Sequence, residues 1–270
     1  MEEPKIITKE EVLAIKEQYK IRISHFVINK EDGSLDVNGD VHITDTNLQK
    51  IPIKFGKIYG DFYCHNNKLT TLKNSPYFVA GDFNCYGNNL TSLELGPTDV
   101  GGFYSCQENN LTSLKGSPRI INGNFNCFLN KLTSLEDGPL KVNGSYYANN
   151  NELISLEGSP YFVTDSFYVS ANPILNLIGC PREIGNIFCF DNTVQLHMGN
   201  QNCNIKEVII QLQEKLPKIE KVLPQIIIDN QRHLPIVFRH MRILDMFPFN
   251  GEFDESYFKD FILDIEDGFR

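Results

Sequence analysis

Cysteines at a fixed interval are the first residues in this chain that could do chemistry. Five lie on one 21-residue column, which would suit a metal centre or a redox relay: Cys64, Cys85, Cys106, Cys127 and Cys189. Zinc ligands converge on a point, whereas residues that recur once per repeat form a line. Ile43, Ala148 and Val169 occupy the same column. We therefore interpret these thiols as small apolar core residues and expect neither a metal nor another cofactor.

Other catalytic arrangements are missing from the sequence. It contains no C-x-x-C, no H-E-x-x-H, no G-x-S-x-G and no GxxxxGK[ST] phosphate loop. His233 and His240 lie seven residues apart near Arg239 and Arg242, and surface or capping roles explain them better than a catalytic pair. We therefore expect a protein that is not an enzyme.

The interval of 21 residues belongs to a repeated unit, G-x-F-x-C-x-x-N-x-L-T-S-L-x-G-x-P-x-x-V-x. The clearest copies begin at Gly60, Gly81, Gly102, Gly123 and Gly144. Weaker copies begin at Gly39 and Asp165, and Gly185 opens a last copy one residue early. A fixed period of this length predicts a solenoid, because each unit can bury its apolar side only against its neighbours. The fold class is thus an α/β solenoid of about eight coils with one short parallel strand per coil.

Alternation within F-x-C predicts which side chains face the core. One predicted inward column is Val41, Phe62, Phe83, Tyr104, Phe125, Tyr146, Phe167 and Ile187, and the cysteine column is the other. Leucines such as Leu69 and Leu72 supply the opposite wall. An asparagine column should be buried and bonded to turn backbone groups: Asn67, Asn88, Asn109, Asn130, Asn151 and Asn172.

Two segments carry a resemblance to a known superfamily. F-Y-C-H-N-N-K-L (62–69) and F-N-C-Y-G-N-N-L (83–90) resemble the leucine-rich-repeat signature. The N-x-L-T-S-L run is similar to the short bacterial type, and the whole unit looks most like repeats of bacteriophage and bacterial members. The resemblance covers about residues 39–198. It implies a leucine-rich-repeat parallel sheet and a binding role without naming a ligand.

Side chains that alternate with the inward columns should lie on the concave outer face of the sheet. Many of these are aromatic and stand among Asn and Ser, a composition typical of protein-binding anchors. The predicted partner-binding residues are Tyr63, His65, Tyr86, Phe103, Phe128, Tyr147, Tyr168, Phe188 and Phe190. Two alternatives stay open: aromatic residues favour strands in any case, and a terminal segment could cover part of the row.

Both ends depart from the repeat, as solenoid caps do. Residues 1–38 read as an αβ cap: a capping box at Thr8–Glu11 opens a helix to about Tyr19, and 21–29 and 35–37 follow as strands. Residues 39–198 form the solenoid. Residues 199–270 read as a helical C-terminal cap or effector segment, with helices expected at 205–216, 219–229, 234–246 and 255–265.

Composition limits the classes of partner. The formal net charge is −9 and the isoelectric point about 5.2, which argues against nucleic acid and against an anionic membrane surface. No apolar run is long enough for a membrane span, and the first residues do not resemble a secretory signal. Free thiols fit a reducing compartment, so we expect the cytoplasm, that of the host if the protein is viral. The oligomeric state stays open.

Two hypotheses about function follow. The first is a non-enzymatic module that binds a protein partner through the outer face; in its sharper version, which rests on the family resemblance, it is a phage-encoded inhibitor or adaptor of a host defence protein. The second places an enzymatic or oligomerising effector in residues 199–270, targeted by the repeats.

Overall fold

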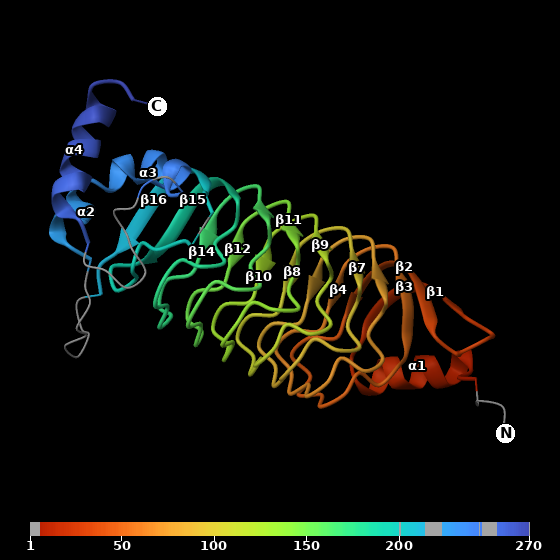
Figure 1. Ribbon diagram of the computed structural model, residues 1–270. Coiled ribbons are helices and arrows are strands. Elements are labelled where there is room, and N and C mark those ends of the chain that lie inside the picture. Colours follow the sequence, from red (N-terminus) through yellow and green to blue (C-terminus); the bar gives the residue numbers. More distant parts are fainter. Residues whose placement is uncertain (1–5, 200, 214–222, 243, 245–252, 270) are drawn as a thin grey trace.

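The protein is a β-solenoid of about eight coils with a cap at each end (Figure 1). The computed structural model describes residues 6–199, 201–213, 223–242, 244 and 253–269. One sheet of 16 strands runs through the molecule, and almost all of its pairings are parallel. This confirms the solenoid predicted from the 21-residue period.

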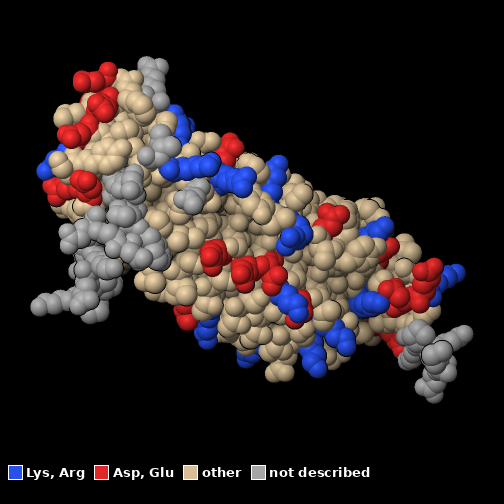
Figure 2. All heavy atoms as spheres, in the orientation of Figure 1, with Lys and Arg blue, Asp and Glu red and all other residues tan. Residues whose placement is uncertain are grey.

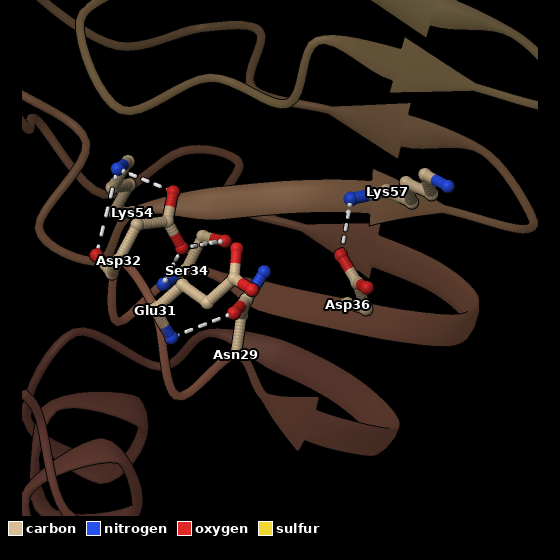
Figure 3. A network of polar contacts seen from close by, with 7 residues as sticks. All are labelled: Asn29, Glu31, Asp32, Ser34, Asp36, Lys54 and Lys57. Carbon is tan, nitrogen blue, oxygen red and sulfur yellow. Dashed lines mark hydrogen bonds and ion pairs between the residues drawn. The ribbon is translucent and has the colours of Figure 1, made fainter.

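The N-terminal segment contains the predicted helix and two strands, and the second strand extends beyond the predicted 35–37 to His42. Helix α1 (Lys9–Gln18) begins at a capping box in which Thr8 and Glu11 exchange hydrogen bonds. Strand β1 (Arg22–Ile28) pairs antiparallel with β2 (Leu35–His42), and β2 continues into the parallel sheet. Figure 3 shows the turn between β1 and β2. There Asp32 accepts hydrogen bonds from Ser34 and forms an ion pair with Lys54 at 2.7 Å.

Each coil contributes two short strands, and the strands form two parallel ladders. The first ladder runs from β2 to β15 through β4 (Phe62–Tyr63), β6 (Phe83–Asn84), β8 (Tyr104–Ser105), β10 (Phe125–Asn126), β12 (Tyr146–Tyr147) and β14 (Phe167–Tyr168). The second ladder consists of β3 (Phe55–Ile58), β5 (Phe78–Val79) and β7 (Asp99–Val100), then β9 (Ile120–Ile121), β11 (Lys141–Val142) and β13 (Phe162–Val163). Strands β2 and β15 (Glu183–Asp191) belong to both ladders, and the second ladder is in two sections because the order of the sheet begins at β7 and ends at β9.

The core is a stack of identical layers. The phenylalanine and tyrosine column from Phe62 to Phe167 and the cysteines from Cys64 to Cys127 are fully buried, as are the paired leucines of each coil. Successive aromatic rings of the column are in contact, with centroids 4.9–5.8 Å apart between Phe62 and Phe167. Burial of one such ring per coil in a continuous line is what holds neighbouring coils together.

The predicted asparagine column is bonded throughout, and all of its members are buried except Asn130, which is partly buried. The Asn88 amide donates to the carbonyls of Cys85 in its own coil and Cys64 in the preceding coil, both at 3.0 Å. Its Oδ1 accepts from the amide of Leu69 at 2.9 Å. Asn109 and Asn151 repeat this arrangement. One side chain thus satisfies backbone groups of two coils where no strand hydrogen bond reaches them.

The turn between the leucine wall and the second ladder requires a left-handed residue in every coil. Gly158 has φ +83°, and a Cβ there would collide with backbone of Leu135 and Glu136 in the coil before it. Gly116 and Gly179 meet the same restriction. Glycine at these positions therefore permits the close stacking of turns.

The C-terminal segment differs from its prediction in one element. Residues 204–211 form strand β16 (Asn204–Gln211), parallel to β15, and not the first turns of a helix expected at 205–216. Ile205, Val208 and Ile210 are its buried residues, and a register shift in the pairing with β15 produces the spacing of three that resembled a helix. Tertiary pairing at the open end of the sheet decides the conformation.

Helices cover the end of the sheet beyond β16 (Figure 1). They are α2 (Gln225–Asp229), a 3-10 turn η1 (Gln231–His233), α3 (Leu234–His240) and α4 (Glu255–Glu266). The helix expected at 255–265 is confirmed, with Gly268 ending it at φ +112°. The helix expected at 219–229 is confirmed over α2, and the helix expected at 234–246 is confirmed over α3. Some of the other residues of these two expected ranges lie outside the described residues. None of the described helices is long and apolar enough to cross a membrane.

The last coil corrects the predicted register by one residue. Phe167 pairs with Phe188, and Tyr168 pairs with Cys189, so Phe188 and not Ile187 continues the aromatic core column. Asn186, 21 residues after Asp165, donates its amide to the Asp165 carbonyl. Gly185 belongs to the preceding column, because a Cβ there would collide with Thr164 as one on Gly101 would with Ala80. The spacing of 21 therefore holds through the last coil.

Candidate binding surface

Seven of the nine predicted contact residues lie on the outer face of the first ladder. We call Tyr63, His65, Tyr86, Phe103, Phe128, Tyr147 and Tyr168 the aromatic row. All seven are partly buried, while the inward residue beside each is fully buried. Backbone hydrogen bonds between neighbouring coils, such as Cys64 N to Asn84 O at 2.8 Å, hold the strands in register. The coil spacing therefore brings rings from different coils within contact distance.

The other two predicted residues are not on this surface. Phe188 and Phe190 are fully buried, with their ring centroids 4.9 Å apart. Phe190 also faces Phe238 of α3, 6.4 Å away. Both predictions were wrong, because the copy that opens at Gly185 was aligned one residue early. For the same reason Cys189 does not belong to the inward cysteine column: it stands opposite Tyr168, in an outward position that is nevertheless buried.

Several rings of the aromatic row stack on a ring of the neighbouring coil. His65 and Tyr86 stack at 4.7 Å with an interplanar angle of 11°, and His42 stacks on Tyr63 at 5.0 Å. Farther along, Tyr147 and Tyr168 are parallel within 2° at 4.9 Å. Stacking restricts the rings before any partner arrives. Little side-chain entropy would then remain to be lost on binding.

A polar column runs beside the row and ties the coils together. The Oδ1 atoms of Asp40, Asp61 and Asp82 accept the backbone amide of the next coil at 2.8–2.9 Å. Asn124 does the same at 2.9 Å, and the Ser145 hydroxyl does so at 3.3 Å. Most coils thus supply an acceptor at this position, either a carboxylate or a neutral group, whereas the coil between Asp82 and Asn124 has Phe103 there. The recurrence of Asp, Asn and Ser at intervals of 21 residues was the signal by which the sequence could have revealed this ladder.

The choice of acceptor makes the two halves of the surface different in charge. The N-terminal half carries three carboxylates in consecutive coils, and no described residue forms an ion pair with Asp40, Asp61 or Asp82. Burial raises the pKa of Asp82 above its ordinary value, and the Asp61 carboxylate adds to the rise. Burial also raises the pKa of Tyr63, whose hydroxyl donates to Asp61 at 2.7 Å.

The C-terminal half is close to neutral. Asp165, an exposed acid of this half, accepts a hydrogen bond from the Ser145 hydroxyl at 2.7 Å, and this bond is the main cause of the lowered pKa of Asp165. In the N-terminal half, burial lowers the pKa of His65 below that of a free imidazole. His65 is therefore largely uncharged at neutral pH and presents a flat aromatic face rather than a cation.

The cysteine column lacks the features of a reactive or metal-binding site. Burial raises the pKa of the Cys127 thiol to about 12 and that of Cys85 well above its ordinary value. A thiol that stays protonated is a poor nucleophile and a poor ligand. Within the described residues, no group of three or more His, Cys, Asp or Glu could hold a metal ion. Outside this column, Cys180 and Cys203 have their Sγ atoms 3.7 Å apart, and both thiols are buried and free.

Comparisons with known proteins add nothing to this geometry. No family model, no curated protein and no solved structure matches the chain.

Proposed function

We propose that the protein is a non-enzymatic, protein-binding module of the leucine-rich-repeat type, and that the aromatic row is its binding surface. The repeat signature in residues 39–198 supports the assignment to that superfamily. One observation carries the functional part. In neighbouring positions of the same strands, aromatic rings fill the core in one column and stand partly exposed in the next.

Strand propensity alone gives a weaker account of the row. It explains a preference for aromatic residues at any strand position, but it does not explain rings that form preordered stacks on the outer side. Rigid, amphipathic rings that keep part of their surface in water are typical anchors of protein interfaces. Polar Asn and Ser side chains between them supply adaptable hydrogen bonds. A protein surface with apolar projections and a basic margin would fit this arrangement.

The three carboxylates of the N-terminal half, which have no ion-pair partner among the described residues, would fix the orientation in which a partner binds. A basic patch on the partner would meet Asp40 and Asp82, while the neutral half around Tyr147 would meet a less charged region. Charge of this kind guides orientation and speeds association more than it strengthens the final complex. We therefore expect the rate of association to fall as salt rises, with a smaller change in the rate of dissociation.

The family resemblance extends the proposal to a biological setting. Because the repeat unit looks like those of bacteriophage and bacterial proteins, we propose that the partner is a host protein in the host cytoplasm, with a defence component as the first candidate. The protein would then act as an inhibitor or adaptor by occupying a surface of that partner.

The alternative, an effector in residues 199–270, receives less support from the contacts. Strand β16 extends the sheet, Phe238 faces Phe190, and the Cys203 amide donates to the Phe238 carbonyl at 3.0 Å. These contacts are those of a cap that closes the core. Under our proposal, deleting residues 199–270 exposes the core and destabilises the solenoid. Under the alternative, the deletion leaves a folded protein that still binds its partner.

A triple variant, Tyr86→Ala, Phe128→Ala and Tyr147→Ala, tests the proposal. We expect it to fold and to lose capture of the partner from an extract of the native host, measured by affinity purification and mass spectrometry. Matched substitutions at exposed aromatics away from the row, Tyr59→Ala and Tyr77→Ala, should leave capture intact. If the triple variant captured every host protein as well as the original chain, the proposal would be wrong.

A further inference from the structure

A second surface with a defined pattern of charge lies along the turns that join the leucine wall to the second ladder. It is a groove of about 610 Å³, and it shares no lining residue with the aromatic row. On the face that Figure 2 draws, acidic atoms gather across the middle of the solenoid and basic atoms lie in the region above them. The lining residues come from consecutive coils, so the groove runs along the solenoid.

One wall of the groove is a single repeat position in four coils. The residue after each proline gives, in order, Arg119, Leu140, Tyr161 and Arg182. Backbone hydrogen bonds of 2.8–3.1 Å join each of these residues to the next. Arginines therefore stand at the two ends of this wall, with an apolar stretch between them. Leu140 and Tyr161 are 37% and 53% exposed, so this stretch is open to a ligand.

The opposite wall carries the opposite charge. It contains three exposed acids: Glu136 and Glu157, each of which follows the second leucine of its coil, and Asp137 beside Glu136. Because the chain advances by one coil in 21 residues, Glu136 lies at a height between Arg119 and Leu140, and Glu157 lies between Leu140 and Tyr161. Gln201 stands at one end, where its amide donates to the Cys180 carbonyl at 2.6 Å.

The arginines and glutamates of the groove have no ion-pair partners in the described part of the chain. Arg182 lies over the Tyr161 ring at 5.8 Å. The coils just before the groove show the contrast. There Lys115 and Glu94, from the same repeat position as Glu136, pair with each other at 2.8 Å. At this repeat position, ion pairing between neighbouring coils therefore stops where the groove begins.

We propose that the groove binds an extended peptide segment of a partner protein with the pattern acidic–basic–apolar–basic–acidic. Side chains of a strand alternate between two sides. The first and fifth would then face Arg119 and Arg182, the third would cover Leu140 and Tyr161, and the second and fourth would face Glu136 and Glu157. Three coil spacings are about 14 Å, and the first and fifth residues of a strand are about 13 Å apart.

Other occupants fit these walls less well. A helix would place residues three and four apart on one side and could not alternate with a period of two. A nucleic acid would meet Glu136 and Glu157 with like charge. The inference is therefore specific to an extended chain, and it does not depend on the aromatic row.

Two peptides of identical composition provide the test. The probes are acetyl-Glu-Lys-Val-Lys-Glu-amide and its charge-exchanged counterpart, acetyl-Lys-Glu-Val-Glu-Lys-amide, titrated at low salt into the full-length protein. Binding is followed by NMR shifts of the Gly158 and Gly179 amides and of the Gln201 side chain. The first peptide would make four contacts between opposite charges, and the second would make four contacts between like charges. We therefore expect a preference on the order of tenfold for the first peptide. Equal affinity, or no binding of the first peptide, would overturn the proposal.

Charge exchange in the protein makes the test reciprocal. The variant Arg119→Glu, Arg182→Glu, Glu136→Arg and Glu157→Arg should prefer the second peptide, because all four side chains are exposed and the fold does not depend on them. A control that exchanges the neighbouring pair, Glu94→Lys with Lys115→Glu, should keep the original preference. A preference that stays with the first peptide in the four-residue variant would contradict the proposal, as would a reversal in the control. Thermal unfolding of each variant verifies that it is folded.

Discussion

The inner and outer columns of the first ladder use similar residues for different purposes. Tyr146 and Tyr147 are neighbours on β12, yet the first is fully buried and the second stands partly exposed and stacked on Tyr168. In the inner column every coil keeps a large apolar side chain. In the outer columns the residue changes from coil to coil. Under the proposed function, the repeat separates stability from recognition within one strand, and each can be changed without the other.

The largest difference between the two columns should appear on removal of a ring. Phe125→Ala empties a fully buried site and should lower the free energy of unfolding by about 3–5 kcal/mol. Phe128→Ala, on the outer side of the same strand region, should lower it by less than about 1 kcal/mol. Urea unfolding of both variants measures this. Equal losses would mean that the outer row is part of the core.

The asparagine column should be the next most sensitive feature. Asn88→Ala removes one acceptor and two donors that serve two coils, and the buried amide of Leu69 is left without its partner. We expect a loss of about 2–3 kcal/mol in the free energy of unfolding. Asn89→Ala, at the exposed neighbouring position, is the control and should cost less than about 0.5 kcal/mol. A small effect at Asn88 would show that water replaces these bonds.

Removal of the Tyr104 hydroxyl, unlike the two substitutions above, should not lower the free energy of unfolding. Its hydroxyl is buried, and within the described part of the chain no residue accepts a hydrogen bond from it. The neighbouring coils have phenylalanine at the same position, Phe83 and Phe125. Tyr104→Phe should therefore leave the free energy of unfolding unchanged or raise it by up to about 1 kcal/mol. A loss of more than 1 kcal/mol in thermal or urea unfolding would reveal a partner for the hydroxyl.

The smallest effect belongs to the N-terminal cap and depends on pH. A hydrogen bond from Lys54, followed by bonds from Ser34, lowers the pKa of Asp32 to about 2. Because this pKa is depressed in the folded state, its stabilisation is present above about pH 4 and is lost as the pH falls toward 2. Both side chains of the ion pair are about half exposed, so Asp32→Asn should cost less than about 0.5 kcal/mol at pH 7. The difference between the two proteins should vanish near pH 2.

Much of the fold could be predicted because the same pattern of apolar and polar residues recurs every 21 residues. The inner columns, the buried asparagines and the capping box follow from fixed spacing and from local chemistry. The elements that were missed depend on contacts outside the repeat. The spacing of Ile205, Val208 and Ile210 fits a helix as well as a strand, and only the pairing with β15 decides for a strand. The register of Phe188 required the exact continuation of 21 residues past a misleading glycine.

The candidate surfaces show the same limit. Seven residues of the aromatic row follow from alternation, because an outer position is simply next to an inner one. The groove could not be found in this way, since its walls come from two repeat positions whose distance depends on how the turns stack. Arg119 and Arg182 are unremarkable in the sequence and gain meaning only when four stacked coils place them at the two ends of one wall.

Site-specific photo-crosslinking tests the central claim, recognition through the outer row, most directly. A photoreactive phenylalanine analogue is placed at Tyr86 or Tyr147 within the row, or at Tyr59 or Tyr77 outside it, and each protein is irradiated in an extract of the native host. The account predicts one shared host protein crosslinked from both row positions and from neither outside position. Crosslinks of equal yield from all four positions, or from Tyr59 and Tyr77 alone, would contradict it.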